Sequence, residues 1–217
     1  MNKKRVLIAV GIIILLLLII FIISIARKYI IINKLAETKE EFFSSNNYSY
    51  CFVPDADKNI TCEYSYKDGK SMQIWKTGDN VDSIIWYDKD TKEKIVIDNG
   101  NSTATITRGQ NEEALPVTVA NTILSSVLPE SMMDKIKIAL TFSINTKEID
   151  NENCYILQPF VGVVSNTYYF NKENETITKT LMGETGKIEF RNWVLNAVTD
   201  EDVSRPSLTG YNLTYNE

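Results

Sequence analysis

The chain opens with an unbroken apolar stretch and continues with short segments of alternating hydrophobic and polar residues. Residues 6–26 contain no charged side chain, and basic residues flank them, Lys3-Lys4-Arg5 before and Arg27-Lys28 after. As a helix this stretch is about 31 Å long, which matches the roughly 30 Å hydrocarbon core of a bilayer. We therefore predict a transmembrane helix over 6–26, preceded by a cytoplasmic tail over 1–5.

A cleavable secretory signal is the alternative for this stretch. Such signals have apolar regions of roughly 7 to 15 residues and end at a small-residue site. Here the run is longer, Ser24-Ile25-Ala26 fits such a site imperfectly, and Ile30-Ile31-Ile32 continue the apolar character. We favour an uncleaved anchor with residues 28–217 outside the cytoplasm. The Lys and Arg residues of the two flanks nearly balance, so orientation depends mainly on the short basic tail.

Past the anchor, the spacing of apolar residues predicts an amphipathic helix over 27–46. The period then changes to two, and turn residues such as Asp68-Gly69 and Asn99-Gly100 separate short strands. Because these strands are sequential and linked by hairpin turns, they predict an antiparallel sheet. The strands are expected at 48–53, 60–67, 70–76, 81–88, 92–98 and 102–107.

Two helices interrupt the strand pattern in the second half of the chain. Residues 117–128 carry an apolar stripe at helical spacing, and Pro129 ends that helix. Ser131-Met132-Met133-Asp134 resembles a capping box, which predicts a second helix with Met132, Met133, Ile136 and Leu140 inward. Further strands are expected at 141–149, 153–160, 166–171, 175–182 and 187–199, followed by an extended tail at 206–211.

Several segments carry a resemblance to a known superfamily. They are Asn47-Tyr48-Ser49-Tyr50, Asn153-Cys154-Tyr155-Ile156-Leu157 with Tyr168-Tyr169-Phe170-Asn171-Lys172-Glu173, and Val198-Thr199-Asp200-Glu201-Asp202-Val203 with Pro206-Ser207-Leu208-Thr209-Gly210-Tyr211. Together with the order helix, meander, helical hairpin, second meander, they make residues 28–211 similar to the LolA/LppX-like lipoprotein-carrier superfamily, in its membrane-anchored Gram-positive form.

The resemblance implies an α+β fold: an N-terminal transmembrane helix, then a curved antiparallel β half-barrel with helices packed on its concave face. The extracytoplasmic LolA-like domain would occupy 47–217. Family members bind acyl chains of lipids or lipoproteins in the concavity or act as envelope sensors, and they share no catalytic residue. LolA itself is a soluble shuttle, so a permanent anchor departs from the family pattern and argues against long-range carriage.

Charge and composition narrow the function classes. Residues 28–217 hold all 28 acidic and 19 of the 23 basic residues, a net charge of −9, which disfavours nucleic acid as a partner. The chain has no histidine. This excludes Ser-His-Asp and Cys-His catalysis and removes the commonest ligand of transition metals. We expect no enzymatic activity, no cofactor and no metal site.

The three cysteines admit two interpretations. Cys51 and Cys62 lie on two strands joined by a turn, so they could face each other and form a disulfide outside the cytoplasm. Alternatively, both are small buried hydrophobic residues, because the register of the strands is not determined by the sequence. Cys154 is expected to be an inert strand residue facing the core.

Two functions remain for the folded part of the chain. The first is binding of a hydrophobic or lipid-linked ligand, such as a lipid or lipoprotein, in an apolar cleft next to the membrane. Met and aromatic linings adapt to flexible apolar ligands, although the same residues could fill a closed core. The second is a sensor or module that binds an envelope protein without a small-molecule ligand. The predicted cleft residues are Trp75, Ile84, Trp86, Leu124, Met132, Met133 and Ile136.

Overall fold

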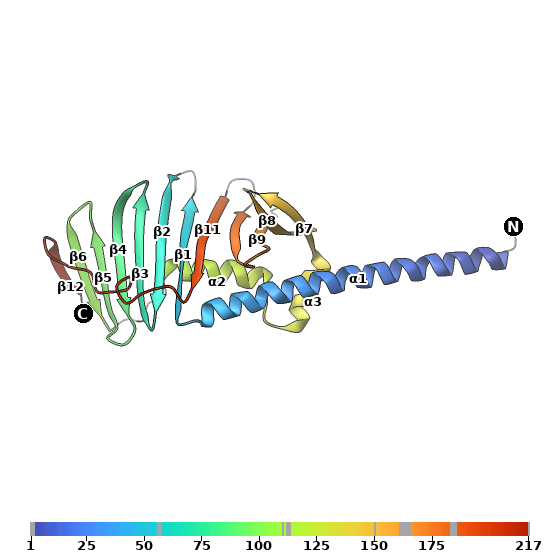
Figure 1. The fold of residues 1–217 in the computed structure, drawn as a ribbon, viewed down its shortest axis with the longest axis horizontal. Helices are drawn as coiled ribbons and strands as arrows, with labels where there is room; N and C mark the ends of the chain where they lie inside the picture. The colour runs from blue at the N-terminus through green and yellow to red at the C-terminus, as the bar shows by residue number, and fades with distance from the viewer. Residues whose placement is uncertain are drawn as a thin grey trace.

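The computed structural model describes residues 3–55, 58–109, 111, 114–149, 151–160, 166–182 and 186–216. Within these residues, one long helix leads into a curved sheet of twelve strands (Figure 1). The helices are α1 (Lys3–Ser44), α2 (Leu115–Val127) and α3 (Met132–Thr141). The strands are β1 (Asn47–Asp55), β2 (Ile60–Lys67), β3 (Lys70–Thr77), β4 (Asn80–Asp88), β5 (Glu93–Asp98), β6 (Thr103–Arg108), β7 (Phe142–Ile149), β8 (Glu152–Pro159), β9 (Thr167–Asn171), β10 (Ile177–Met182), β11 (Gly186–Leu195) and β12 (Asn212–Asn216).

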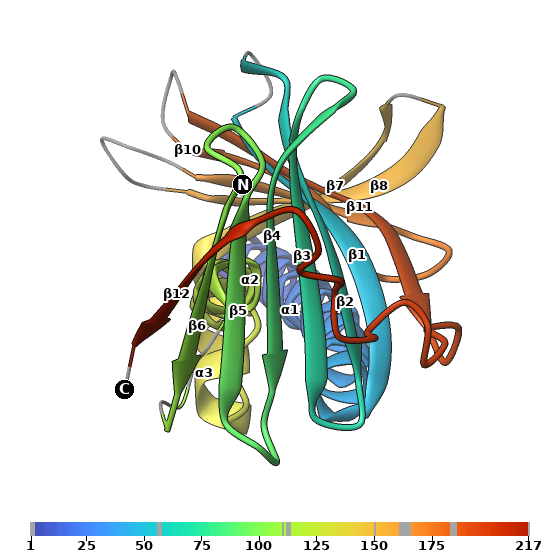
Figure 2. The ribbon, with the colours of Figure 1, turned by 90° about the vertical axis from the view of Figure 1, so that its left-hand side faces the viewer.

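The strands form one sheet in the order β12-β6-β5-β4-β3-β2-β1-β11-β10-β9-β8-β7. Neighbours that follow each other in sequence pair antiparallel, and β1 pairs with β11 to join the two meanders. The hairpin between β2 and β3 is tight because Asp68 and Gly69 both adopt positive φ, 47° and 86°, as a two-residue primed turn requires. The predicted α+β half-barrel with helices on its concave face is confirmed (Figure 2).

The end of the sheet differs from the prediction. Strand β11 stops at Leu195, and residues 197–211 cross the outer face of the sheet to reach β12. Strand β12 pairs parallel with β6, so the sheet is mixed rather than wholly antiparallel. A parallel pair needs a long connection between its strands. The hydrophobic periodicity of neighbouring residues therefore does not predict the parallel pairing of β12 with β6.

Helix α1 is continuous from the apolar stretch into the core of the sheet (Figure 1). No residue of its apolar window is buried, whereas Ile32, Leu35 and Phe42 are almost completely buried. This is one helix long and apolar enough to cross a membrane, found near the N-terminus. Residues 3–44 of the predicted divisions 1–5, 6–26 and 27–46 therefore form a single helix, which ends before Ser45 and Asn46; Met1 and Asn2 lie outside the described residues.

The main core lies on the concave face of the sheet. Helices α1 and α2 pack there against aromatic residues of β1, β2, β9 and β11. The Trp193 indole stacks on Tyr50, with ring centroids 4.4 Å apart, and meets Phe42 edge-on at 4.5 Å. Such aromatic pairs add specific geometry to apolar burial.

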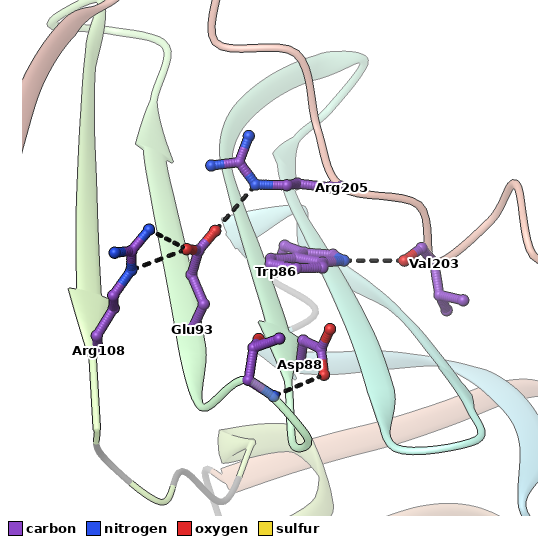
Figure 3. A network of polar contacts seen from close by, with 7 residues as sticks. Trp86, Asp88, Glu93, Arg108, Val203 and Arg205 are labelled. Atoms are coloured by element: carbon purple, nitrogen blue, oxygen red, sulfur yellow. Dashed lines mark hydrogen bonds and ion pairs between the residues drawn. The ribbon is translucent and has the colours of Figure 1, made fainter.

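The outer face carries a second, smaller core. Trp86, Ile95, Ile97, Ala104 and Ile106 form it, and the C-terminal segment covers it with Leu208 and Tyr211. Hydrogen bonds hold that segment in place (Figure 3): Trp86 Nε1 donates to the Val203 oxygen at 2.8 Å, and Arg205 donates to Glu93 at 2.9 Å. Arg108 binds the other carboxylate oxygen of Glu93 at 3.0 Å.

Candidate functional site

Helix α3 crosses α1 at the place where α1 leaves the rest of the fold (Figure 1). An apolar groove lies at this crossing. Its volume is about 380 Å³, and its wall is almost entirely hydrocarbon. The α1 residues of the wall recur every three or four positions, so they form one stripe along that helix. The groove is lined by Ile22, Ile25, Ala26, Tyr29, Ile30, Met132 and Ile136.

The start of α3 is set by the predicted capping box, which is confirmed. The predicted inward face of this helix is wrong for Met132, Met133 and Leu140, which are exposed. The Ser131 hydroxyl accepts a hydrogen bond from the Asp134 amide at 3.1 Å and donates to its carboxylate at 2.8 Å. Lys137 contacts the same carboxylate at 2.6 Å. Hydrogen bonds from Lys137 and from Ser131 lower the pKa of Asp134. The carboxylate is therefore charged at neutral pH, as the N-terminal end of a helix favours.

Two lysines tie α3 to α1 beside the groove. Lys28 of α1 donates to the Phe142 oxygen at 2.7 Å, and its ammonium lies 4.5 Å from the centre of the Phe160 ring. Lys135 of α3 donates to Asn33 Oδ1 at 2.8 Å. Burial lowers the pKa of Lys28. These contacts fix the crossing near both ends of α3.

Large apolar side chains remain exposed around the groove. Met132, Met133, Ile30 and Phe160 keep between 58% and 68% of their surface accessible. A cluster of this kind next to an apolar groove is typical of a binding or membrane-contacting surface.

The structure separates the seven predicted cleft residues into four places. Trp75 and Trp86 face opposite sides of the sheet, because side chains alternate along strands and Trp86 pairs with Met72, three positions before Trp75 on β3. The single predicted cleft is therefore not formed. Trp75 and Leu124 belong to the main core, Ile84 and Trp86 to the outer core, Met132 and Ile136 to the groove, and Met133 to the exposed surface beside it.

The concave side between α1, α2 and the sheet is closely packed. The apolar crevice there has a volume of about 20 Å³, room for roughly one water molecule. Its walls include Leu35, Leu124, Phe170 and Trp193. An acyl chain does not fit this crevice, so a lipid ligand would have to bind elsewhere.

The α1 side of the groove was not predicted as part of the site. Ile22, Ile25, Ala26, Tyr29 and Ile30 were assigned only to the anchor and its extension. Their signal in the sequence is the helical stripe that continues past Arg27-Lys28 without a break. A membrane span and one side of a binding groove have the same hydrophobic pattern, so the pattern alone does not distinguish them.

A second, polar groove of about 640 Å³ opens within the sheet. Among the described residues, β10 pairs with β11 through residues 186–189. Beyond them, β11 has an irregular register with β1, and Asn192 there adopts φ 55°, as in a β-bulge. The Trp193 indole donates to the Ile177 oxygen at 2.7 Å where a strand would otherwise pair.

Charged side chains on the wall of this polar groove neutralise one another. Glu189 binds both Lys187 and Arg191. Burial acts to raise the pKa of Glu189, but hydrogen bonds from these two cations lower it overall. These ion pairs offset part of the charge on this wall, which Glu152 and Lys179 also line.

None of the three cysteines forms a disulfide, and the register explains why Cys51 and Cys62 do not pair. Cys51 pairs with Glu63, and Cys62 pairs with Phe52. Since successive side chains point to opposite faces, Cys51 lies on the outer face and Cys62 in the main core. Cys154 is also buried. Among the described residues, no group of three or more His, Cys, Asp or Glu could hold a metal ion.

Comparison with known sequences identifies no family for the chain. No protein-family model and no curated protein match it. Among solved structures it is similar to an uncharacterized conserved protein from Thermus thermophilus, with 7% identity, a TM-score of 0.49, and coverage of 84% of this chain and 98% of that one.

Two further structures are similar at lower TM-scores. MucB in complex with MucA(peri) shows 13% identity, a TM-score of 0.42, and coverage of 84% of this chain and 61% of that one. PNGF-II shows 10% identity, a TM-score of 0.30, and coverage of 79% and 30%. Function is therefore inferred from the residues of this chain.

Proposed function

We propose that this chain is a single-pass membrane protein whose extracytoplasmic part binds the acyl portion of a lipid or lipid-linked ligand. The site is the groove between α1 and α3, and the observation that carries the proposal is its hydrocarbon wall, shared between the apolar segment and the folded part. A volume of about 380 Å³ is suited to part of one acyl chain, since ligand pockets typically measure about 300–1,000 Å³.

The continuity of α1 supports an uncleaved anchor. No turn or extended residue separates the apolar window from the buried part of the helix. Cleavage after Ala26 would also remove Ile22 and Ile25, which form one wall of the groove. The short basic tail favours the N-terminus in the cytoplasm, and the remaining chain then lies outside it.

The proposed function agrees with the resemblance to the LolA/LppX-like superfamily, but it places the ligand at a different site. In that family the acyl chain binds within the concavity of the half-barrel. Here aromatic side chains fill the concavity, and the open apolar space lies at its membrane end. A tethered protein of this kind would hold or sense a ligand at its own membrane rather than carry it away, and it needs no catalytic group.

The decisive experiment fills the groove. Ala26→Phe places a ring where the acyl chain would lie, and excluding two methylene groups costs ~1.6 kcal/mol, or roughly a tenfold loss of occupancy. Native mass spectrometry of the full-length protein after detergent exchange measures the lipid retained. Ser24→Phe is the matched control, because Ser24 is exposed, is equally small and does not line the groove.

We expect one retained lipid in the wild type and in Ser24→Phe, and its loss in Ala26→Phe. Equal lipid masses in all three proteins would refute the groove as the site. A wild-type protein free of lipid would favour the second function, recognition of an envelope protein. The polar groove beside β11 supports that alternative, because in the described part of the sheet β11 pairs with β10 only up to Glu189, and strand edges without a partner accept extended peptides.

A further inference from the structure

The crossing of α1 and α3 has a consequence for where the bilayer surface lies. If residues 6–26 span the hydrocarbon core, its outer boundary falls near Ala26. Ile22 lies four residues, or about 6 Å, further into the membrane along the helix axis. Met132 and Ile136 of α3 share a groove with Ile22 and Ile25. Helix α3 must therefore reach the same depth as this end of the anchor.

We infer that α3 is an interfacial membrane helix, which seats the folded part of the chain directly on the outer leaflet. This inference rests on the proposed membrane anchor. The α3 face toward the leaflet comprises Met132, Met133 and Ile136, with Ile30 of α1 beside it. Interfacial helices bury their apolar faces roughly 5–10 Å into the boundary between headgroups and acyl chains.

The exposed apolar side chains of this face are better suited to the boundary between headgroups and acyl chains than to water. Met132 and Met133 keep 64% and 68% of their surface accessible, and Ile30 keeps 63%. Nothing else in the described part of the fold covers the groove that they border. A leaflet would remove these side chains from water without any further chain.

Charge also favours a lipid surface at this place. Arg27, Lys28, Lys135 and Lys137 lie at the crossing with Asp134, which pairs with Lys137, whereas the region beyond the anchor has a net charge of −9. The nearby Lys34 pairs with Glu175 and adds no net charge. Lysines near a bilayer reach the headgroups while their aliphatic stems remain in apolar surroundings. Each basic residue close to an anionic surface contributes about 1 kcal/mol of attraction. The acidic remainder of the protein is then directed away from the membrane.

A depth measurement tests the inference on the full-length protein. Met133→Cys, in a Cys51→Ser background, is labelled with an environment-sensitive NBD dye and reconstituted in vesicles of phosphatidylcholine and phosphatidylglycerol. Met133 is chosen because it is exposed and does not line the groove. Thr214→Cys on the exposed strand β12 is the water-facing control, and Leu15→Cys within the anchor is the buried control.

We expect the dye at position 133 to emit at shorter wavelength than the dye at 214. It should also lose more than half of its emission to a phospholipid spin-labelled near its headgroup end. A dye at 133 that behaves like the dye at 214, while the dye at 15 is quenched by a phospholipid spin-labelled deep in its acyl chain, overturns the interfacial helix and leaves the anchor intact.

The two proposals fail in different ways. Filling the groove with Ala26→Phe tests lipid retention without removing Met133 from the leaflet. A quenched dye at 133 together with unchanged lipid retention in Ala26→Phe would support the interfacial helix and refute the groove as a ligand site.

Discussion

The side chains of Cys51 and Cys62 show that the register of two paired strands decides whether two cysteines can form a disulfide. In the observed pairing each cysteine lies opposite a different residue, Glu63 and Phe52, and the two thiols point to opposite faces. Burial raises the pKa of both thiols. Because the thiolate is the reactive form, both are expected to react slowly in the folded protein.

Alkylation followed by mass spectrometry tests this arrangement. Under native, non-reducing conditions we expect slow labelling of the half-buried Cys51 and none of Cys62 or Cys154, which expose at most 2% of their surface. After denaturation without reductant, all three cysteines should be labelled. A cross-linked peptide that joins Cys51 and Cys62 would contradict the register.

At the scale of elements, the hydrogen bonds at the start of α3 show how the local sequence positions a helix of the proposed site. The pattern Ser131-Met132-Met133-Asp134 directs the helix to begin at Met132, and the observed hydrogen bonds agree. This start places Met132 and Ile136 on the same side of α3, one turn apart, where they meet the stripe of α1.

Ser131→Ala is therefore expected to loosen α3. Loss of a serine N-cap typically costs about 1 kcal/mol, which corresponds to roughly fivefold faster local opening. Hydrogen exchange of the amides at 132–141 in the full-length protein measures this change. Ser204→Ala removes an exposed hydroxyl in the C-terminal segment and serves as the control, with exchange in α3 unchanged. Equal exchange in both variants would show that packing against α1, not the cap, holds α3.

At the scale of the whole molecule, the C-terminal segment links elements that are far apart in the sequence. It covers the outer core and then adds β12 to the edge of β6, so it protects both an apolar surface and a strand edge. Glu93 fastens it to the sheet by binding Arg205 and Arg108 at the same time. Burial acts to raise the pKa of Glu93, but hydrogen bonds from both arginines lower it overall.

A carboxylate whose pKa is lowered by folding stabilises the protein above its unfolded pKa. That contribution is lost as the pH falls through the folded value. Glu93→Gln should therefore lower the free energy of unfolding by about 1–3 kcal/mol at neutral pH, and this deficit should shrink below roughly pH 4. Denaturation of the micelle-bound protein followed by tryptophan fluorescence measures it. The exposed Glu148→Gln is the control; a Glu93→Gln deficit independent of pH would exclude the ionic contribution.

The order and type of the elements could be predicted from the sequence because they depend on local patterns. Hydrophobic period, capping residues and turn residues placed α2, α3 and the strands β1 to β11 close to their observed positions. The apolar helix over 6–26 was likewise predicted from the length and composition of that stretch alone. The antiparallel meanders followed from these elements, since short sequential strands joined by hairpins favour one antiparallel sheet. The half-barrel with helices on its concave face was implied by the superfamily resemblance.

Only the tertiary structure decided which residues meet. A shift of one residue in register moves a side chain to the other face of the sheet. The observed register places Trp75 and Trp86 on opposite faces, although both were predicted to line one cleft. The parallel pairing of β12 depends on a connection that crosses the sheet. The groove depends on the crossing of two helices that are far apart in sequence, which no local period encodes.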